Sequence, residues 1–228
     1  MKLKSMTSVD SALTVLYRDQ WLVAVSKPSG MIVHRGWGRD QVTVADIVRD
    51  QIIGRPIHAV HRLDRGTSGV LLFALDPGAA RYMQAQFEAG RAIKRYLALV
   101  RGPVLNACLL DHPVPQKEGG ERVAAITEFQ PLAHSGRWTL LEARPRTGRL
   151  HQIRRHLKHL SHHIVGDVRY GKGDVNRFFR ESYSLNRLAL HAFALEITDP
   201  GGNQLLLQAA VPPDLSSALE KLGVWPLA

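Results

Sequence analysis

The sequence has one cysteine among 228 residues. A single cysteine excludes an internal disulfide framework and a zinc site built from several thiolates, so Cys108 is expected to be a small buried residue. Long apolar runs are also missing, since no stretch approaches the roughly 20 apolar residues that span a bilayer. No apolar segment follows the charged residues 1–6, which argues against a signal peptide. The chain is therefore expected to be cytoplasmic and independent of membranes.

Acidic residues are few relative to basic ones. The chain has 20 Asp and Glu against 30 Lys and Arg, which gives a formal net charge of +10. Residues 144–180 alone hold ten Lys or Arg and two Asp, a net charge of +8. His, Tyr and Gly are interleaved with these cations, which favours a nucleic-acid surface over a merely solvated basic face.

The apolar pattern predicts strands joined by hairpins, with a few helices between them. Helices are expected at 42–51, at 79–90 and from 147 onward. The predicted strands are residues 13–17, 21–25, 31–34, 96–100, 124–129, 138–142, 187–197 and 204–210. This order is typical of an α+β fold with a mixed, mostly antiparallel central sheet. We expect a flexible N-terminus at 1–12 and one domain over 13–228.

Residues 61–70 form the most informative segment. Asp64 lies two residues after Arg62 and directly before Arg65, and a Gly-rich turn leads into the apolar run 70–75. If the segment is extended, Arg62 and Asp64 project to the same side. A structural ion pair is the ordinary interpretation of such spacing. A charged turn against a buried strand needs partners or water, and chemistry is one reason to retain it.

A second basic segment covers residues 145–156. Thr147 and Gly148 were expected to open a helix whose N-terminal N–H groups face a phosphate. On that helix Arg154 borders the apolar face, so a carboxylate is its natural partner. His156, His159 and His162 recur at a spacing that zinc could use, but without nearby carboxylates the sequence predicts no metal site.

Tyr96 begins an apolar strand. The ordinary interpretation is a core residue with its hydroxyl at the rim. The functional alternative is a platform on which a base stacks, or a group that accepts a proton. The sequence alone leaves both open.

These segments resemble motifs of the RluA-type RNA pseudouridine synthases. The resemblance rests on three blocks, which in chain order are residues 27–30, 61–70 and 147–154. Gly166-Asp167 and Tyr170-Gly171 follow them. It extends from about residue 13 to 210. Residues 33–37, 48–51 and 176–179 look like the branch that modifies a uridine in the acceptor/T-arm region of tRNA, at position 65. No S4-like RNA-binding domain would fit before residue 13.

The resemblance implies an isomerase that converts uridine in RNA to pseudouridine without a cofactor or metal, acting as a monomer on tRNA. It implies that Asp64 is the nucleophile, that Arg154 pairs with it and keeps it ionised, and that Tyr96 stacks on the uracil. The path at C1′ of the ribose stays open. The substrate contacts implied by the same motifs are Arg62, Arg65, Thr67, Arg149, His151 and Ile153.

Three alternatives remain at the level of sequence. The same chemistry could act on rRNA or on another tRNA uridine. A non-catalytic RNA-binding protein is disfavoured because Asp64 and Tyr96 are both present. An N-glycosidase is disfavoured because hydrolytic glycosidases usually place two carboxylates around one bond, and the three motif blocks contain only Asp64.

Overall fold

The computed structural model describes residues 13–35 and 42–226. The expected flexible segment 1–12 lies outside the described residues, as do the last residues of the segment 33–37. The strands are β1 (Val15–Arg18), β2 (Leu22–Lys27), β3 (His58–Ala59), β4 (Ser68–Ala74), β5 (Ile93–Arg101), β6 (Cys108–Asp111), β7 (Val114–Pro115), β8 (Arg122–Val123), β9 (Ile126–Ser135), β10 (Trp138–Pro145), β11 (Leu190–Thr198) and β12 (Gln204–Gln208). The helices are α1 (Val44–Ile47), which continues as the π-helix η1 (Val48–Ile53), α2 (Pro77–Glu88), α3 (Gln152–His159), α4 (Gly173–Tyr183) and α5 (Pro213–Leu222).

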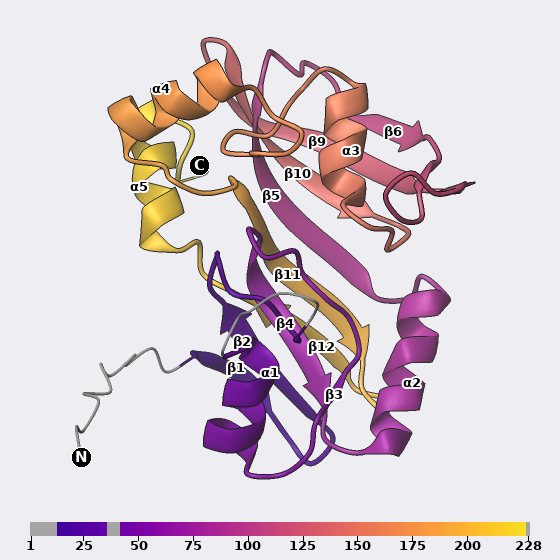
Figure 1. The fold of residues 1–228 in the computed structure, drawn as a ribbon. Helices are drawn as coiled ribbons and strands as arrows, with labels where there is room; N and C mark the ends of the chain where they lie inside the picture. The colour runs from indigo at the N-terminus through magenta and orange to yellow at the C-terminus, as the bar shows by residue number, and fades with distance from the viewer. Residues whose placement is uncertain (1–12, 36–41, 227–228) are drawn as a thin grey trace, which may run out of the picture.

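Most of these strands join one large sheet, with the order β1-β2-β4-β11-β5-β10-β9-β6 (Figure 1). Strand β12 pairs with β11, and β3 pairs with β4. The β4–β11 pair is parallel, and every other pair within the described residues is antiparallel. The α+β class with a mixed, mostly antiparallel sheet is therefore confirmed.

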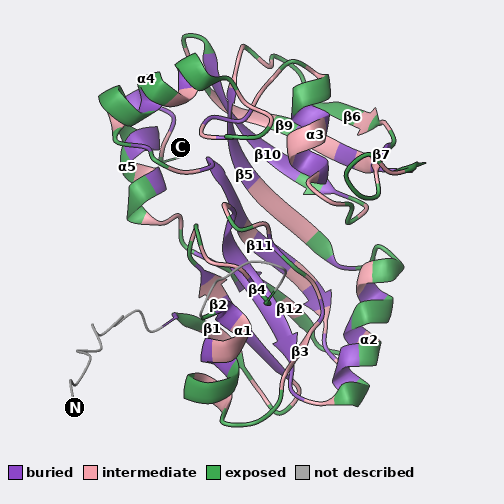
Figure 2. Cartoon of the chain, in the orientation of Figure 1, coloured by how far each residue is buried: buried purple, intermediate pink, exposed green. Residues whose placement is uncertain are grey.

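Strand β4 lies between β2 and β11 inside the sheet, and all seven of its residues are buried (Figure 2). A continuous apolar run is what a strand covered on both faces requires. Its second residue, Gly69, has φ +117° and passes so close to β11 that a Cβ would stand 2.1 Å from the carbonyl oxygen of Ala192. Only glycine allows that approach, which fixes where the motif at 61–70 meets the sheet.

The core has distinct clusters at the two ends of the long strand β5. One cluster joins β5, β9 and β10 to helices α3, α4 and α5. Two others pack the faces of β2 and β4 against α2 and against α1 with η1. In Figure 1 strand β5 runs through both ends of the molecule, and α3 lies on the far side of it from β4. This arrangement leaves one cavity where the two ends meet.

Several local expectations were wrong. Residues 31–34 form no strand, and the helix expected from residue 147 begins only at Gln152. Cys108 is exposed on the edge strand β6 rather than buried, since no further strand covers that edge in the described structure. Helices α4 and α5 were not predicted. Helix α2 was predicted, and it begins where Asp76 accepts hydrogen bonds from the N–H groups of Gly78 and Ala79.

Candidate active site

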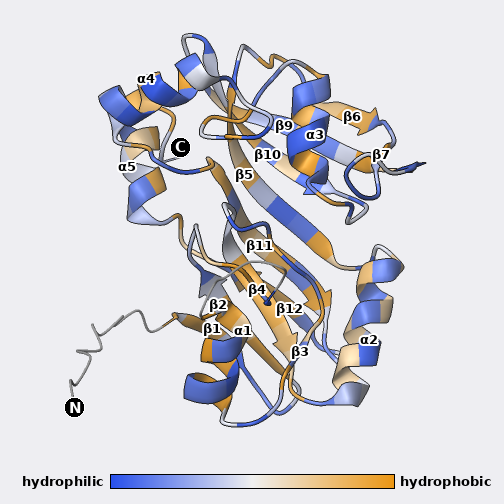
Figure 3. Cartoon of the chain, in the orientation of Figure 1, coloured by the Kyte–Doolittle hydropathy of each residue, from blue (hydrophilic) through white to orange (hydrophobic). Residues whose placement is uncertain are grey.

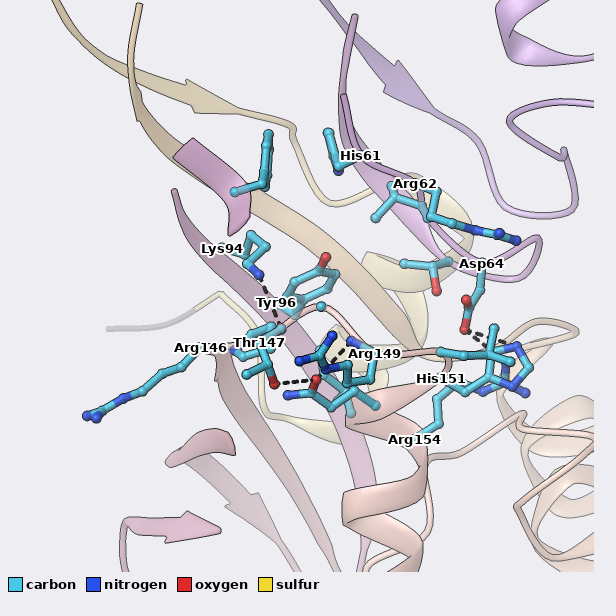
Figure 4. Close-up of a pocket in the computed structure, with 18 of the residues that line it drawn as sticks. His61, Arg62, Asp64, Lys94, Tyr96, Arg146, Thr147, Arg149, His151 and Arg154 are labelled. Atoms are coloured by element: carbon cyan, nitrogen blue, oxygen red, sulfur yellow. Dashed lines mark hydrogen bonds and ion pairs between the residues drawn. The ribbon is translucent and has the colours of Figure 1, made fainter. Parts of the chain in front are cut away.

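One cavity of about 600 Å³ brings the sequence motifs together (Figure 4). Its volume lies in the range of ligand-binding pockets, about 300–1,000 Å³. Both ends of the molecule contribute walls: the segment before β4, the start of β5, and the loop that leads from β10 into α3. The predicted site residues that line it are Arg62, Asp64, Thr67, Tyr96, Arg149, His151, Ile153 and Arg154.

The carboxylate of Asp64 pairs with the guanidinium of Arg154. Arg154 Nη1 donates to Asp64 Oδ2 at 3.0 Å across 90 residues of sequence, and the Asp64 side chain remains 20% exposed to the cavity. On its other side Arg154 donates to both carboxylate oxygens of Asp167, from Nε at 2.8 Å and Nη2 at 2.9 Å. Arg154 therefore has the inward carboxylate partner that the sequence predicted, together with a second one that it did not.

Asp167 is buried behind Arg154, with a side chain only 1% exposed. Burial opposes its ionisation, but hydrogen bonds from Arg154 and from the backbone N–H of Tyr170 outweigh burial and lower the pKa of Asp167. A charged Asp167 fixes the plane of the guanidinium. Arg154 can then present one N–H to the cavity in a defined direction.

The turn that carries Asp64 is held by the turn at residues 27–30. Lys27 is fully buried and its Nζ donates to three carbonyl oxygens, those of Pro28, Met31 and Arg65, at 2.8, 2.6 and 3.2 Å. Ser29 Oγ donates to the Gly66 carbonyl at 2.8 Å. The sequence indicated two separate turns. No pattern in the sequence indicated that one lysine hydrogen-bonds to both turns.

The loop between β10 and α3 forms another wall. Gln152 organises it, because its side-chain oxygen accepts from Thr147 Oγ1 at 2.6 Å and from the Arg149 N–H at 3.0 Å. His151 ends the loop in a left-handed conformation, φ 53°. The expectation of a helix N-terminus at Thr147 and Gly148 was wrong. These residues enter the cavity as a loop, and helix α3 starts five residues after Thr147.

His151 lies beside the nucleophile candidate. Its Nε2 is 3.8 Å from Asp64 Oδ2, and its Nδ1 is 3.0 Å from the hydroxyl of Tyr170. That hydroxyl also accepts from Arg155 Nε at 3.0 Å. Burial lowers the pKa of His151, although Asp64 opposes the effect. The lowered pKa favours the neutral ring, whose Nε2 faces Asp64.

Tyr96 lies between the two ends of the cavity, on the first half of β5. Burial, reinforced by the negative charge of Asp64, raises the pKa of Tyr96 well above its usual range. The phenol therefore keeps its proton at neutral pH and enters any reaction as a donor or as a stacking ring.

The remaining predicted residues take different places. Thr67 and Ile153 are buried in the wall, whereas Arg62 and Arg149 are exposed at its edge. Arg65 is exposed and is not among the lining residues, and its carbonyl accepts hydrogen bonds from Lys27 and Gly30. Helix α3 is hydrophilic along much of its length (Figure 3), and its basic residues include Arg154, Arg155 and Lys158.

The described residues show neither a membrane-spanning helix nor a metal-binding cluster. None of their helices has the length and apolar character that a bilayer crossing demands. Within the same ranges, no group of three or more His, Cys, Asp or Glu side chains could hold a metal ion. His156, one of the histidines with zinc-like spacing, instead contacts Thr127 Oγ1 and the His112 carbonyl.

The chain is similar to known proteins in sequence and in fold. A family described as RNA pseudouridylate synthase matches residues 21–159. The tRNA pseudouridine synthase C of Salmonella typhimurium is 41% identical, over 92% of this chain and 90% of that protein. The same-named Vibrio cholerae protein is 40% identical, over 92% and 96%. The structure of human RNA pseudouridylate synthase domain containing 4 aligns with a TM-score of 0.79 and 27% identity, covering 94% of this chain and 95% of that one.

The family match spans more than half of the chain, and the relatives align along nearly all of it. Two of the motif blocks on which the resemblance rested, 61–70 and 147–154, meet in the cavity, and the third, 27–30, holds the turn that carries Asp64. The protein therefore belongs to the RNA pseudouridylate synthase family, and it is an isomerase that converts uridine in RNA to pseudouridine.

Proposed function

We propose that the RNA is tRNA and that the target is the acceptor/T-arm uridine at position 65. The proposal is supported by the two bacterial relatives, which are both tRNA pseudouridine synthases C and are both near 40% identical along nearly the full chain. The +8 charge of residues 144–180 provides phosphate contacts for a folded RNA. A tRNA substrate also agrees with a cytoplasmic enzyme.

The Asp64–Arg154 pair supports Asp64 as the nucleophile. A carboxylate can form and release an ester with a sugar or add to a base, and it must be ionised to do so. The reaction breaks the N1–C1′ bond, forms a C5–C1′ bond, and moves one proton from C5 to N1, so nothing is oxidised or lost. Arg154 donates to Asp64, and its own second partner Asp167 keeps Arg154 in place.

The uridine must leave its helix to reach the cavity. Flipping a base out of a stack opposes binding by a few kcal/mol. Tyr96 gives the displaced uracil a ring to stack on, with Ile153 in the wall as a packing partner. Arg62 is exposed at the rim, and it is our candidate for filling the vacated space or for holding the phosphate of the flipped nucleotide.

The test compares the wild type with the Asp64→Asn variant on tRNA that carries tritium at C5 of its uridines. The wild type is expected to release tritium and to form pseudouridine at one position, with no free uracil. The variant should bind tRNA and release none. Asp174→Asn, which removes an exposed carboxylate from α4, serves as the matched control. Residual turnover in a clean Asp64→Asn preparation contradicts the nucleophile role. Pseudouridine mapped in total RNA of cells lacking the protein decides the target.

A further inference from the structure

The cavity extends beyond the Asp64 side of Tyr96. Lys94 lies two residues before Tyr96 on β5, so both side chains leave the same face of the strand, about 7 Å apart. The far part of the cavity is lined by Val60, His61, Phe87, Glu88, Lys94 and Gly148. The mechanism above assigns no role to these residues.

Lys94 is a positive charge without a carboxylate partner. Its Nζ donates to the Thr147 carbonyl at 3.2 Å, and within the described residues no Asp or Glu forms an ion pair with it. Glu88 lines the same cavity yet makes no salt bridge to Lys94. Burial lowers the pKa of Lys94 to about 8, so the ammonium is still largely charged at pH 7. A partly buried cation with two unused donors favours an anionic ligand.

The neighbours of Lys94 leave that charge uncompensated. His61 stacks on Phe87 with ring centroids 5.0 Å apart. Its Nε2 accepts from the Leu72 N–H at 2.9 Å. Burial, and then the charge of Lys94, lower the pKa of His61 to about 3. The imidazole and phenyl rings beside Lys94 are therefore neutral, which suits a nucleotide, and the exposed Glu88 is the one carboxylate that the described residues add to this part of the lining.

Gly148 lies next to the ammonium and offers a second donor. The backbone N–H of Gly148 makes no hydrogen bond within the described residues. Gly148 is exposed, and a Cβ built on it would stand 4.0 Å from Lys94 Nζ and meet nothing nearer. A free N–H beside a lysine ammonium is a common arrangement for binding a phosphate.

We propose that Lys94 and the Gly148 N–H form a subsite for a backbone phosphate adjoining the flipped uridine. The proposal rests on the isomerase activity on RNA proposed above. A chain that enters with its uracil on Tyr96 can place a phosphate at Lys94, because their spacing on β5 is one that a single nucleotide can span. The contact fixes the strand that carries the target and so positions C1′ at Asp64.

The experiment pairs a protein change with an RNA change. Lys94→Met removes the charge and keeps the length of the side chain. A synthetic substrate RNA with a methylphosphonate in place of one phosphate flanking the target uridine removes the matching charge. Each change alone should weaken binding about 10- to 100-fold, the range for one charge-assisted contact. Applied together, they should weaken binding no further than either one alone.

Two further variants separate the explanations. Lys221→Met removes an exposed lysine from α5, outside the cavity, and its effect should be small and independent of the methylphosphonate. Gly148→Ala leaves the charge and narrows the subsite, and it should weaken binding of normal RNA more than of the methylphosphonate RNA. Its backbone conformation is open to alanine because φ is not positive.

The outcomes are distinct. The subsite is overturned if the losses of RNA affinity caused by Lys94→Met and by the methylphosphonate add up. It is also overturned if wild-type protein loses no affinity when either flanking phosphate is replaced. The second result uses no variant, so misfolding of a variant cannot cause it. If wild-type protein forms no pseudouridine in the unmodified RNA, the proposed function fails instead. If Lys94→Met lowers the single-turnover rate at saturating RNA with unchanged affinity, Lys94 acts on the reacting base and the phosphate assignment is overturned.

Discussion

Asp167 accepts two parallel hydrogen bonds from Arg154, from Nε to Oδ2 at 2.8 Å and from Nη2 to Oδ1 at 2.9 Å. The third nitrogen, Nη1, is the one that reaches Asp64 at 3.0 Å. The planar guanidinium can therefore serve two carboxylates at once, which a lysine ammonium does with far less directional control. One buried carboxylate thereby orients the charge that faces the reacting one.

Asp167→Asn is expected to lower the rate of isomerisation while leaving RNA binding nearly intact. The amide keeps the size of the side chain but removes its charge and one acceptor for Arg154. Breaking a buried ion pair typically destabilises a protein by about 3–5 kcal/mol, and Asp64 retains part of the interaction here. Single-turnover rates and urea unfolding check this, with Asp174→Asn as the exposed control. An unchanged rate in a destabilised protein would reduce Asp167 to a structural anchor.

The sequence carried enough information for the class of fold and the nearest partners of the site. Apolar runs such as residues 70–75 and the stripe of α2 are local signals, and both elements were predicted. The inward position of Arg154 followed from helical spacing alone. The resemblance then named Asp64 as its partner, and the two meet at 3.0 Å.

Long-range contacts account for what the sequence could not show. The tie between Lys27 and the Arg65 carbonyl joins residues 38 apart, and no local pattern encodes it. The helix expected at Thr147 starts late because the side chain of Gln152 satisfies the loop in place of a helical turn. Helix α4 was missed since its apolar residues, such as Phe179, are scattered among polar ones in a strongly basic stretch.

Tyr96→Phe is expected to preserve stacking and to reduce the rate. The raised pKa of Tyr96 means that its hydroxyl is protonated at neutral pH, so the variant loses a donor and not a phenolate. RNA affinity should change by less than about threefold, because the ring that stacks is retained. Rates measured with tritium release and affinities measured by filter binding separate the two effects. Full activity would leave Tyr96 with a packing role only.

Tyr170→Phe is expected to slow the reaction about tenfold through His151. Without the hydroxyl, Nδ1 of His151 loses its hydrogen-bond partner, and the ring whose Nε2 faces Asp64 is no longer held in place. Comparable loss of an orienting partner at a histidine metal ligand lowers affinity or activity 10- to 100-fold. The slope of rate against pH between 5 and 7 should change as well, because the variant removes the hydroxyl that contacts Nδ1 of His151.

The control for this variant is Tyr183→Phe. Tyr183 lies on α4 in an aromatic cluster with Phe179, and its ring packing does not involve the cavity. Its substitution should leave both the rate and the pH profile as in the wild type. Equal effects of the two tyrosine variants would mean that the loss at Tyr170 is a general loss of stability.

Mild acid is expected to destabilise the protein before its carboxylates titrate. Burial lowers the pKa of His61 to about 3 and that of His191 to about 4, against 6.5 for an ordinary histidine. Between pH 6.5 and 4 the unfolded chain thus binds protons that the folded protein does not, so stability falls as pH falls. Asp167 acts in the same direction only at lower pH, because its folded pKa lies below 3.8.

Urea unfolding at pH 7, 6, 5 and 4.5 measures the effect, which should total on the order of 3–5 kcal/mol over that range, at about 1.4 kcal/mol for each pKa unit. His191→Asn should flatten the dependence, since the amide oxygen can replace Nδ1 as the acceptor for the Ser68 hydroxyl without binding a proton. His58→Gln changes a histidine that makes no such buried contact and should leave the slope unchanged. A free energy of unfolding that stays constant from pH 7 to 5 would show that these two rings can be charged inside the fold.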